Sequence, residues 1–89
     1  MKAVIWSKTT CPHCVQAKAL MDNYNISYEE RILGEDWTAD QLFEQCDAEN
    51  IPRPRSAPQI WLDDNYIGGH DNLIDYLEQT HSGSTEGKL

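Results

Sequence analysis

Two cysteines separated by two residues, in the segment Cys11-Pro12-His13-Cys14, are the first candidates for chemistry in this sequence. Two thiols at this spacing can be oxidised to a disulfide and reduced again, and the first thiol is acidified when it lies at the amino end of a helix. The segment therefore predicts a redox-active pair. Cys11 would be the attacking thiolate, and Cys14, one helical turn later, would be the more buried, resolving thiol.

The two residues between the cysteines are expected to tune the pair. Pro12 is tolerated in a first helical turn, where its missing N–H would have no partner, and it stiffens the loop. A protonated His13 near the sulfur would stabilise the Cys11 thiolate further. A more stable thiolate makes the disulfide more oxidising.

Other uses of the cysteine pair compete with redox chemistry. A Cys-X-X-Cys half-site can bind zinc, but the other candidate ligands, Cys46, His70 and His81, are scattered singly along the chain. Both cysteines could also be inert structural thiols. We favour redox chemistry and expect no metal site, because the pair is predicted at a strand-to-helix junction, where active sites of α/β sheets lie.

The elements that would position this pair follow from apolar spacing and from turn residues. A buried strand is predicted at 3–6, a helix from the cysteine pair, and a second strand over 26–32. Thr38 and Gln41 form a capping-box pattern that predicts a helix of about 12 residues. Three prolines in 52–58 indicate an extended loop, and 59–62 with 66–68 form a hairpin around a turn at 63–65. Asp71 or Asn72 would cap a last helix.

This order, β-α-β-α-β-β-α, predicts an α/β fold with a four-stranded mixed sheet and three helices. The strand-helix-strand unit gives a parallel pair, and the hairpin adds antiparallel strands. Residues 1–81 would form one domain, and 82–89 a flexible tail.

Cys46 continues the apolar face of Leu42 and Phe43, so it is expected in the core, as are Trp6 and Trp61.

Length and charge exclude several classes of function. The chain has 89 residues, room for a single domain, and a formal net charge of −8. Such a charge repels phosphate backbones and anionic lipid, so binding to nucleic acid or a membrane surface is not expected. The sequence has neither an apolar run long enough to span a membrane nor the apolar core of a signal peptide, so we expect a cytoplasmic protein.

Three separated segments resemble the glutaredoxin family. Lys8-Thr9-Thr10-Cys11-Pro12-His13-Cys14 is similar to its Cys-Pro-Tyr-Cys site with an upstream lysine. Ser56-Ala57-Pro58 is similar to its Thr-Val-Pro segment, whose proline is cis and packs against the active disulfide. Ile67-Gly68-Gly69-His70-Asp71-Asn72 is similar to its Gly-Gly-Cys-Asp-Asp segment, which holds the γ-glutamyl end of glutathione.

The resemblance implies a thioredoxin-like fold and an enzyme that reduces protein disulfides and glutathione mixed disulfides. Glutathione would be the co-substrate that reduces it again, and disulfide-containing client proteins would be its partners. We expect it to act as a monomer.

The resemblance also implies a glutathione site. Arg53 or Arg55 would hold the glycine carboxylate, with Lys8 near the thiolate. The backbone of Ala57 would pair with the cysteinyl part of glutathione, next to Pro58. The γ-glutamyl end would lie at the last helix, where a helix amino end can bind a carboxylate. The residues expected there are Gly69, His70 and Asp71.

Some positions depart from the family pattern. His13 replaces the usual tyrosine, and His70 stands where many relatives have cysteine. Two alternative functions stay open. The first is a thioredoxin-like reductant recycled by a flavoprotein reductase, for example as electron donor to ribonucleotide reductase. The second is a carrier that holds an iron-sulfur cluster through Cys11 and glutathione.

Overall fold

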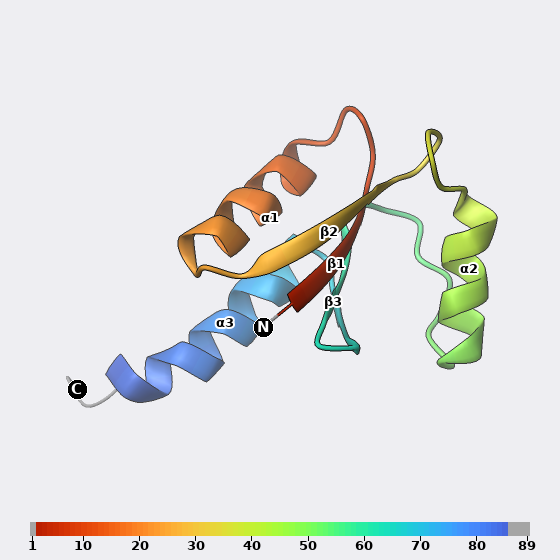
Figure 1. Ribbon diagram of the computed structural model, residues 1–89. Coiled ribbons are helices and arrows are strands. Elements are labelled where there is room, and N and C mark those ends of the chain that lie inside the picture. Colours follow the sequence, from red (N-terminus) through yellow and green to blue (C-terminus); the bar gives the residue numbers. More distant parts are fainter. Residues whose placement is uncertain (1, 86–89) are drawn as a thin grey trace.

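The computed structural model describes residues 2–85, and the side chains of residues 2–79. The elements in this part of the chain follow the order that the sequence predicts (Figure 1). They are β1 (Lys2–Ser7), α1 (Pro12–Asn23), β2 (Ser27–Ile32), α2 (Ala39–Ala48), β3 (Gln59–Leu62), β4 (Asn65–Gly68) and α3 (His70–Thr85). No helix within residues 2–85 combines the length and the apolar character needed to cross a membrane.

The four strands form one mixed sheet in the order β2-β1-β3-β4. Strands β1 and β2 are parallel, whereas β1 with β3 and β3 with β4 are antiparallel. The predicted four-stranded mixed sheet is therefore confirmed. The carboxyl end of β1, at Ser7, leads directly into the loop that carries the cysteine pair.

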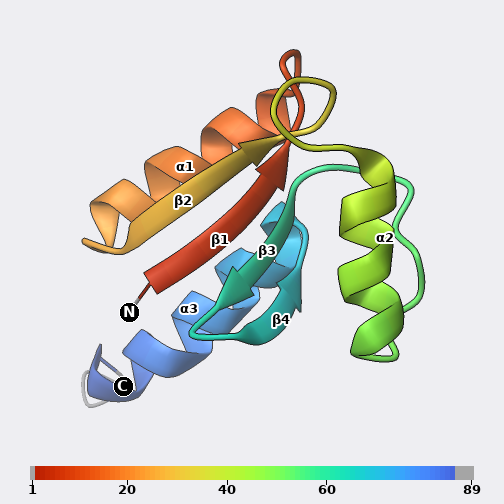
Figure 2. The same cartoon turned by 45° about the vertical axis from the view of Figure 1, so that its right-hand side comes forward.

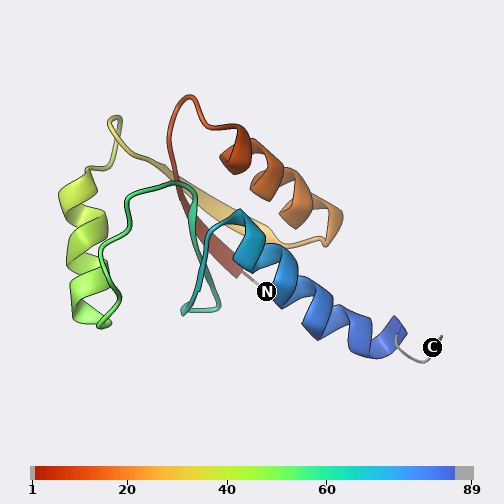
Figure 3. The same ribbon diagram turned by 180° about the vertical axis from the view of Figure 1, so that it is seen from behind.

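Helices cover both faces of the sheet. Helices α1 and α3 lie on one face and α2 lies on the other (Figures 2 and 3). Alternate residues of β1 point to opposite faces. Ala3 and Ile5 pack with α1 and α3, in a cluster that also contains Ala17, Met21, Leu73 and Leu77. Trp6 packs with α2, in a second cluster that contains Leu42, Cys46 and Trp61.

The ends of several elements differ from the sequence prediction. The turn of the hairpin takes only Asp63 and Asp64, at φ 49° and 70°, so β4 begins at Asn65. Two residues with left-handed backbone are enough to reverse a hairpin. Helix α2 has 10 residues and carries the predicted capping box, in which Thr38 and Gln41 bond each other's backbone N–H groups.

Helix α3 begins at His70, before the predicted caps Asp71 and Asn72. Asn72 Oδ1 accepts a hydrogen bond from the N–H of Gly69 at 3.2 Å, so the third helical residue bonds back to the residue before the helix. Because of this bond, α3 begins directly after Gly69, earlier than the predicted caps place its start. Gly68 has φ +118°, and a Cβ there would lie 2.8 Å from Asn72 Oδ1, so the turn into α3 requires glycine.

The same helix continues to Thr85, so residues 82–85 of the predicted tail are helical. Once a helix is formed, each added residue gains one backbone hydrogen bond, and no proline interrupts this stretch. The remainder of the predicted tail, residues 86–89, lies outside the described residues.

Candidate functional site

Cys11 and Cys14 are joined by a disulfide at the amino end of α1. Cys11 is the N-cap residue, and its Sγ accepts a hydrogen bond from the N–H of Cys14 at 3.1 Å. Pro12 occupies the first helical turn, as predicted. The partial positive charge of the helix end and this N–H both favour negative charge on the Cys11 sulfur when the disulfide is open.

The two sulfurs differ in exposure. Cys14 is 1% exposed, whereas Cys11 is partly exposed. The predicted order of burial is therefore confirmed. An incoming sulfur can reach Cys11 from solvent, whereas the Cys14 side chain is covered.

The loop before β3 lies against Cys11. The peptide bond between Ala57 and Pro58 is cis, and the carbonyl oxygen of Ala57 lies 3.7 Å from Cys11 Sγ. Pro58 is buried and Ala57 is partly exposed. A backbone segment with an accessible edge thus lies directly beside the reactive sulfur.

Two residues that sequence reasoning did not select hold this loop in place. The side-chain amide of Gln59 donates a hydrogen bond to the carbonyl oxygen of Ser56 at 2.9 Å, and the hydroxyl of Tyr66 donates to the other end of the Gln59 amide. Gln59 is 4% exposed. A glutamine at the start of a buried apolar strand, directly after the proline, is the signal that could have identified it, because a buried amide needs hydrogen-bond partners.

One side of this loop borders a hollow of about 300 Å³, called here the His70 hollow. It brings together residues from the α1 amino end, the loop before β3 and the α3 amino end. Its lining consists of His13, Ser56, Ala57, Pro58, Gly69, His70, Asp71 and Asn72. The predicted γ-glutamyl contacts Gly69, His70 and Asp71 therefore share one hollow with His13 and the cis-proline loop.

The loop also borders a second hollow of about 240 Å³, called here the Lys8 hollow. Its lining includes apolar residues of α2 and two cationic side chains. Its lining consists of Lys8, Leu33, Ala39, Leu42, Phe43, Pro54, Arg55 and Ser56. Ser56 lines both hollows, so the loop that contacts Cys11 borders both of them.

The predicted basic residues separate into two groups. Lys8 and Arg55 line the Lys8 hollow. Arg53 instead forms two hydrogen bonds with Asp47 of α2, Nε to Oδ1 at 3.2 Å and Nη2 to Oδ2 at 2.7 Å. The hydrogen bond with Arg53 lowers the pKa of Asp47 and raises that of Arg53. Of the two candidate arginines, Arg55 is the one beside Lys8.

Lys18, one turn after Cys14 in α1, forms an ion pair with Glu30 of β2. Its Nζ lies 2.7 Å from Glu30 Oε2, and the hydroxyl of fully buried Ser7 donates to the same oxygen at 2.7 Å. Burial alone would raise the pKa of Glu30, but the hydrogen bonds from Lys18 and Ser7 outweigh it and the pKa is lowered. This network ties α1 to the sheet close to the cysteine pair.

Cys46 and the two tryptophans expected in the core are buried. Cys46 is 0% exposed, Trp6 is 1% and Trp61 is 2%. Burial raises the pKa of the Cys46 thiol, which keeps it protonated and unreactive. Among the side chains of residues 2–79, no group of three or more histidine, cysteine, aspartate or glutamate residues is arranged to hold a metal ion.

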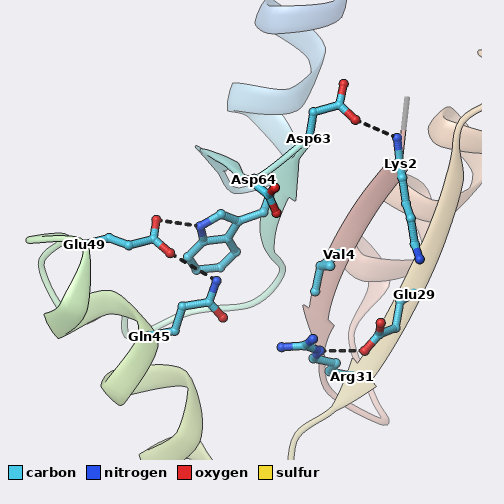
Figure 4. A pocket seen from close by; sticks show the side chains of 9 residues that line it. Lys2, Val4, Glu29, Arg31, Gln45, Glu49, Asp63 and Asp64 are labelled. Atoms are coloured by element: carbon cyan, nitrogen blue, oxygen red, sulfur yellow. Dashed lines mark hydrogen bonds and ion pairs between the residues drawn. The ribbon is translucent and has the colours of Figure 1, made fainter.

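A further hollow of about 340 Å³ lies between α2 and the sheet, away from the cysteines (Figure 4). It shares no residue with the other two hollows. Glu49 of α2 lies on one side of the hollow, and the Arg31–Glu29 ion pair lies on the other. Glu49 Oε1 accepts a hydrogen bond from Trp61 Nε1 at 3.0 Å. None of its lining residues belongs to the amino end of α1 or to the loop before β3, which surround the cysteine pair.

Comparisons with known proteins point to one family. The glutaredoxin family model matches residues 3–67. Glutaredoxin 1 of Rickettsia typhi is 34% identical over 76 residues, which cover 85% of this chain and 69% of that protein. Glutaredoxin 3 of Escherichia coli K12 is 33% identical over 70 residues, which cover 78% of this chain and 77% of the relative.

Among solved structures, glutaredoxin 1 from Francisella tularensis, crystallised with cacodylate, superposes with a TM-score of 0.74 at 27% identity. The match covers 89% of this chain and 94% of that one. The fold implied by the sequence resemblance is therefore confirmed.

Proposed function

The chain belongs to the glutaredoxin family and is a thiol-disulfide oxidoreductase, and from this premise we propose that glutathione is its co-substrate and that Cys11 is its nucleophile. The observation that supports this proposal most strongly is the position of Cys11 Sγ. It lies at the helix amino end, 3.7 Å from the carbonyl oxygen of Ala57, in a loop that borders both the His70 hollow and the Lys8 hollow.

In the first step, the Cys11 thiolate attacks one sulfur of a substrate disulfide. A new bond forms between Cys11 and that sulfur, the substrate disulfide breaks, and the other sulfur leaves as a thiolate that takes a proton from water. The helix end favours the attacking thiolate because it stabilises negative charge on Cys11. The covered Cys14 does not compete for the incoming disulfide.

In the second step, the mixed disulfide on Cys11 is broken by a second thiolate. Cys14 attacks Cys11, forms the internal disulfide and releases the bound substrate sulfur as a thiolate. Where that bound sulfur belongs to glutathione, a second glutathione thiolate can attack it instead, which forms oxidised glutathione and frees the Cys11 thiolate. Two further glutathione molecules reduce the internal disulfide. The result is a net transfer of two electrons from two thiols to one disulfide.

Glutathione fits the site as an extended tripeptide with a charged group at each end. Its cysteinyl backbone would pair with Ala57, next to Pro58. Its γ-glutamyl end would lie in the His70 hollow, at the positive end of α3, with Gly69, His70 and Asp71. Its glycine carboxylate would meet Lys8 and Arg55 in the Lys8 hollow.

The roles of the two cysteines can be tested with matched serine variants. Cys14→Ser should retain activity on a small glutathione mixed disulfide, because a second glutathione can resolve the intermediate on Cys11. Cys11→Ser should lose nearly all activity on the same substrate. Equal loss in both variants would mean that a dithiol mechanism is obligatory and would contradict the monothiol route.

The same proposal places the protein in the cytoplasm, where thiols are kept reduced, and makes disulfide-containing proteins its clients. The exposed side chain of Val15, 61% accessible in the first turns of α1, gives such clients an apolar contact next to Cys11.

Sedimentation of the reduced protein should show a monomer, because catalysis as proposed uses residues of one chain only.

A further inference from the structure

Two imidazoles from distant parts of the chain meet beside the redox site. His13 lies in the first turn of α1, and His70 is the first residue of α3. Their ring centroids are 5.9 Å apart, with the rings tilted by 42°. Both rings line the His70 hollow together with Ala57 and Pro58, so they face the space next to Cys11.

Neither imidazole is engaged by a strong partner within the described residues. The nearest carboxylate, Asp71, has Oδ1 3.7 Å from His70 Nδ1, and its side chain is 96% exposed. That contact is screened by water. The His70 side chain, by contrast, is 15% exposed and directed into the hollow.

The hollow contains no permanent positive charge. Its titratable lining groups are His13 from α1, and His70 and Asp71 from α3. The loop before β3 contributes Ser56, Ala57 and Pro58, which carry no charge. Asn72 is neutral, and its Oδ1 is held by the N–H of Gly69. Positive charge on a side chain in this hollow can therefore come only from the imidazoles.

We propose that His13 and His70 act together as a pH-dependent clamp for the carboxylate at the γ-glutamyl end of glutathione. A proton on either ring places a positive charge at the amino end of α3, next to the backbone N–H groups that attract the same carboxylate. This inference rests on the proposed use of glutathione. It adds a regulation of affinity by pH in the range where imidazoles change charge.

The sign of the effect follows from the charges. An imidazole attracts the carboxylate only when it is protonated, and a rise in pH removes that proton and leaves only the helix end. The KM for a glutathione mixed disulfide should therefore rise on the order of fivefold from pH 6 to pH 8.

The test measures kcat and KM separately from pH 6 to pH 8 in the wild type and in three His70 or His13 variants. His70→Gln should raise the KM at low pH and reduce its pH dependence, because only the His13 ring can then carry charge. His70→Lys should keep it at its low value, because its charge is permanent. His13→Tyr should reduce the pH dependence of the KM.

A matched control is His81→Gln, since His81 lies in the same helix, about 16 Å along its axis from His70. It should leave the pH dependence of the KM unchanged. A wild-type KM that is constant with pH, while turnover persists, would overturn the clamp and leave glutathione use intact. A pH dependence that survives in His13→Tyr at full size would overturn the joint action of the two rings. Absence of turnover at every pH would reject glutathione use and the clamp with it.

Discussion

Replacing Arg55 should weaken glutathione binding, whereas replacing Arg53 should not. The two arginines are two residues apart in the same loop, and both are exposed. Arg55 lines the Lys8 hollow, whereas Arg53 does not line it and is held by two hydrogen bonds to Asp47 of α2. Arg53→Ala is therefore a matched control for Arg55→Ala.

The expected size follows from the exposure of Arg55. A well-formed hydrogen bond between charged groups contributes about 1.5–3 kcal/mol, and an exposed ion pair contributes up to about 1 kcal/mol. Arg55 is exposed, so the lower range applies and about 1 kcal/mol of binding free energy should be lost with Arg55→Ala. At 1.4 kcal/mol per factor of ten, the KM rises about fivefold.

The assay is steady-state reduction of a glutathione mixed disulfide at varied substrate concentration. Arg55→Ala should raise the KM with kcat nearly unchanged, because the arginine holds the end of the ligand far from the reacting sulfurs. Arg53→Ala should leave both constants close to those of the wild type. An equal rise in KM for both variants, or a rise for Arg53→Ala alone, would refute the assignment of the glycine carboxylate to the Lys8 hollow.

Three other predictions concern stability and potential. Glu30→Gln should lower the free energy of unfolding by about 1–2 kcal/mol, because it removes the carboxylate that Lys18 and Ser7 share. Urea unfolding measures this loss, and it should be much smaller in Glu29→Gln, an exposed control. Folding lowers the pKa of Glu30, so the stabilisation by its carboxylate is present above the pKa of the unfolded state and is lost as the pH falls through the pKa of the folded state. The unfolding free energies of the wild type and Glu30→Gln should therefore converge below about pH 4. A difference that stays constant with pH would argue against the network. His13→Tyr should make the disulfide less oxidising in a redox equilibrium with glutathione, and an unchanged equilibrium would remove the role of the imidazole at the thiolate.

Local signals in the sequence were enough to predict most of the fold. Thr38 and Gln41 predict a helix start because a capping box involves only residues three apart, and both of its hydrogen bonds are present. Cys11 and Pro12 likewise predict the start of α1, where they serve as N-cap and first-turn residues. These features depend on neighbours in the chain, so a linear pattern suffices.

Contacts between distant segments were not predictable in the same way. The choice between Arg53 and Arg55 depends on where α2 places Asp47, which no local pattern specifies. The approach of His13 to His70 depends on α1 and α3 covering the same face of the sheet with their amino ends close together. Residue types identified the participants at the site, and only the packing of the helices on the sheet determined which of them meet.

The most direct test of glutathione dependence is reduction of the Cys11–Cys14 disulfide by millimolar glutathione with no other protein present. Thiol labelling of the two cysteines over time would follow the reaction, and a parallel sample with a thioredoxin reductase and its reductant would provide the comparison. The account predicts full reduction by glutathione alone, with oxidised glutathione as the product. A disulfide that stays closed in glutathione and opens only with the flavoprotein would contradict it.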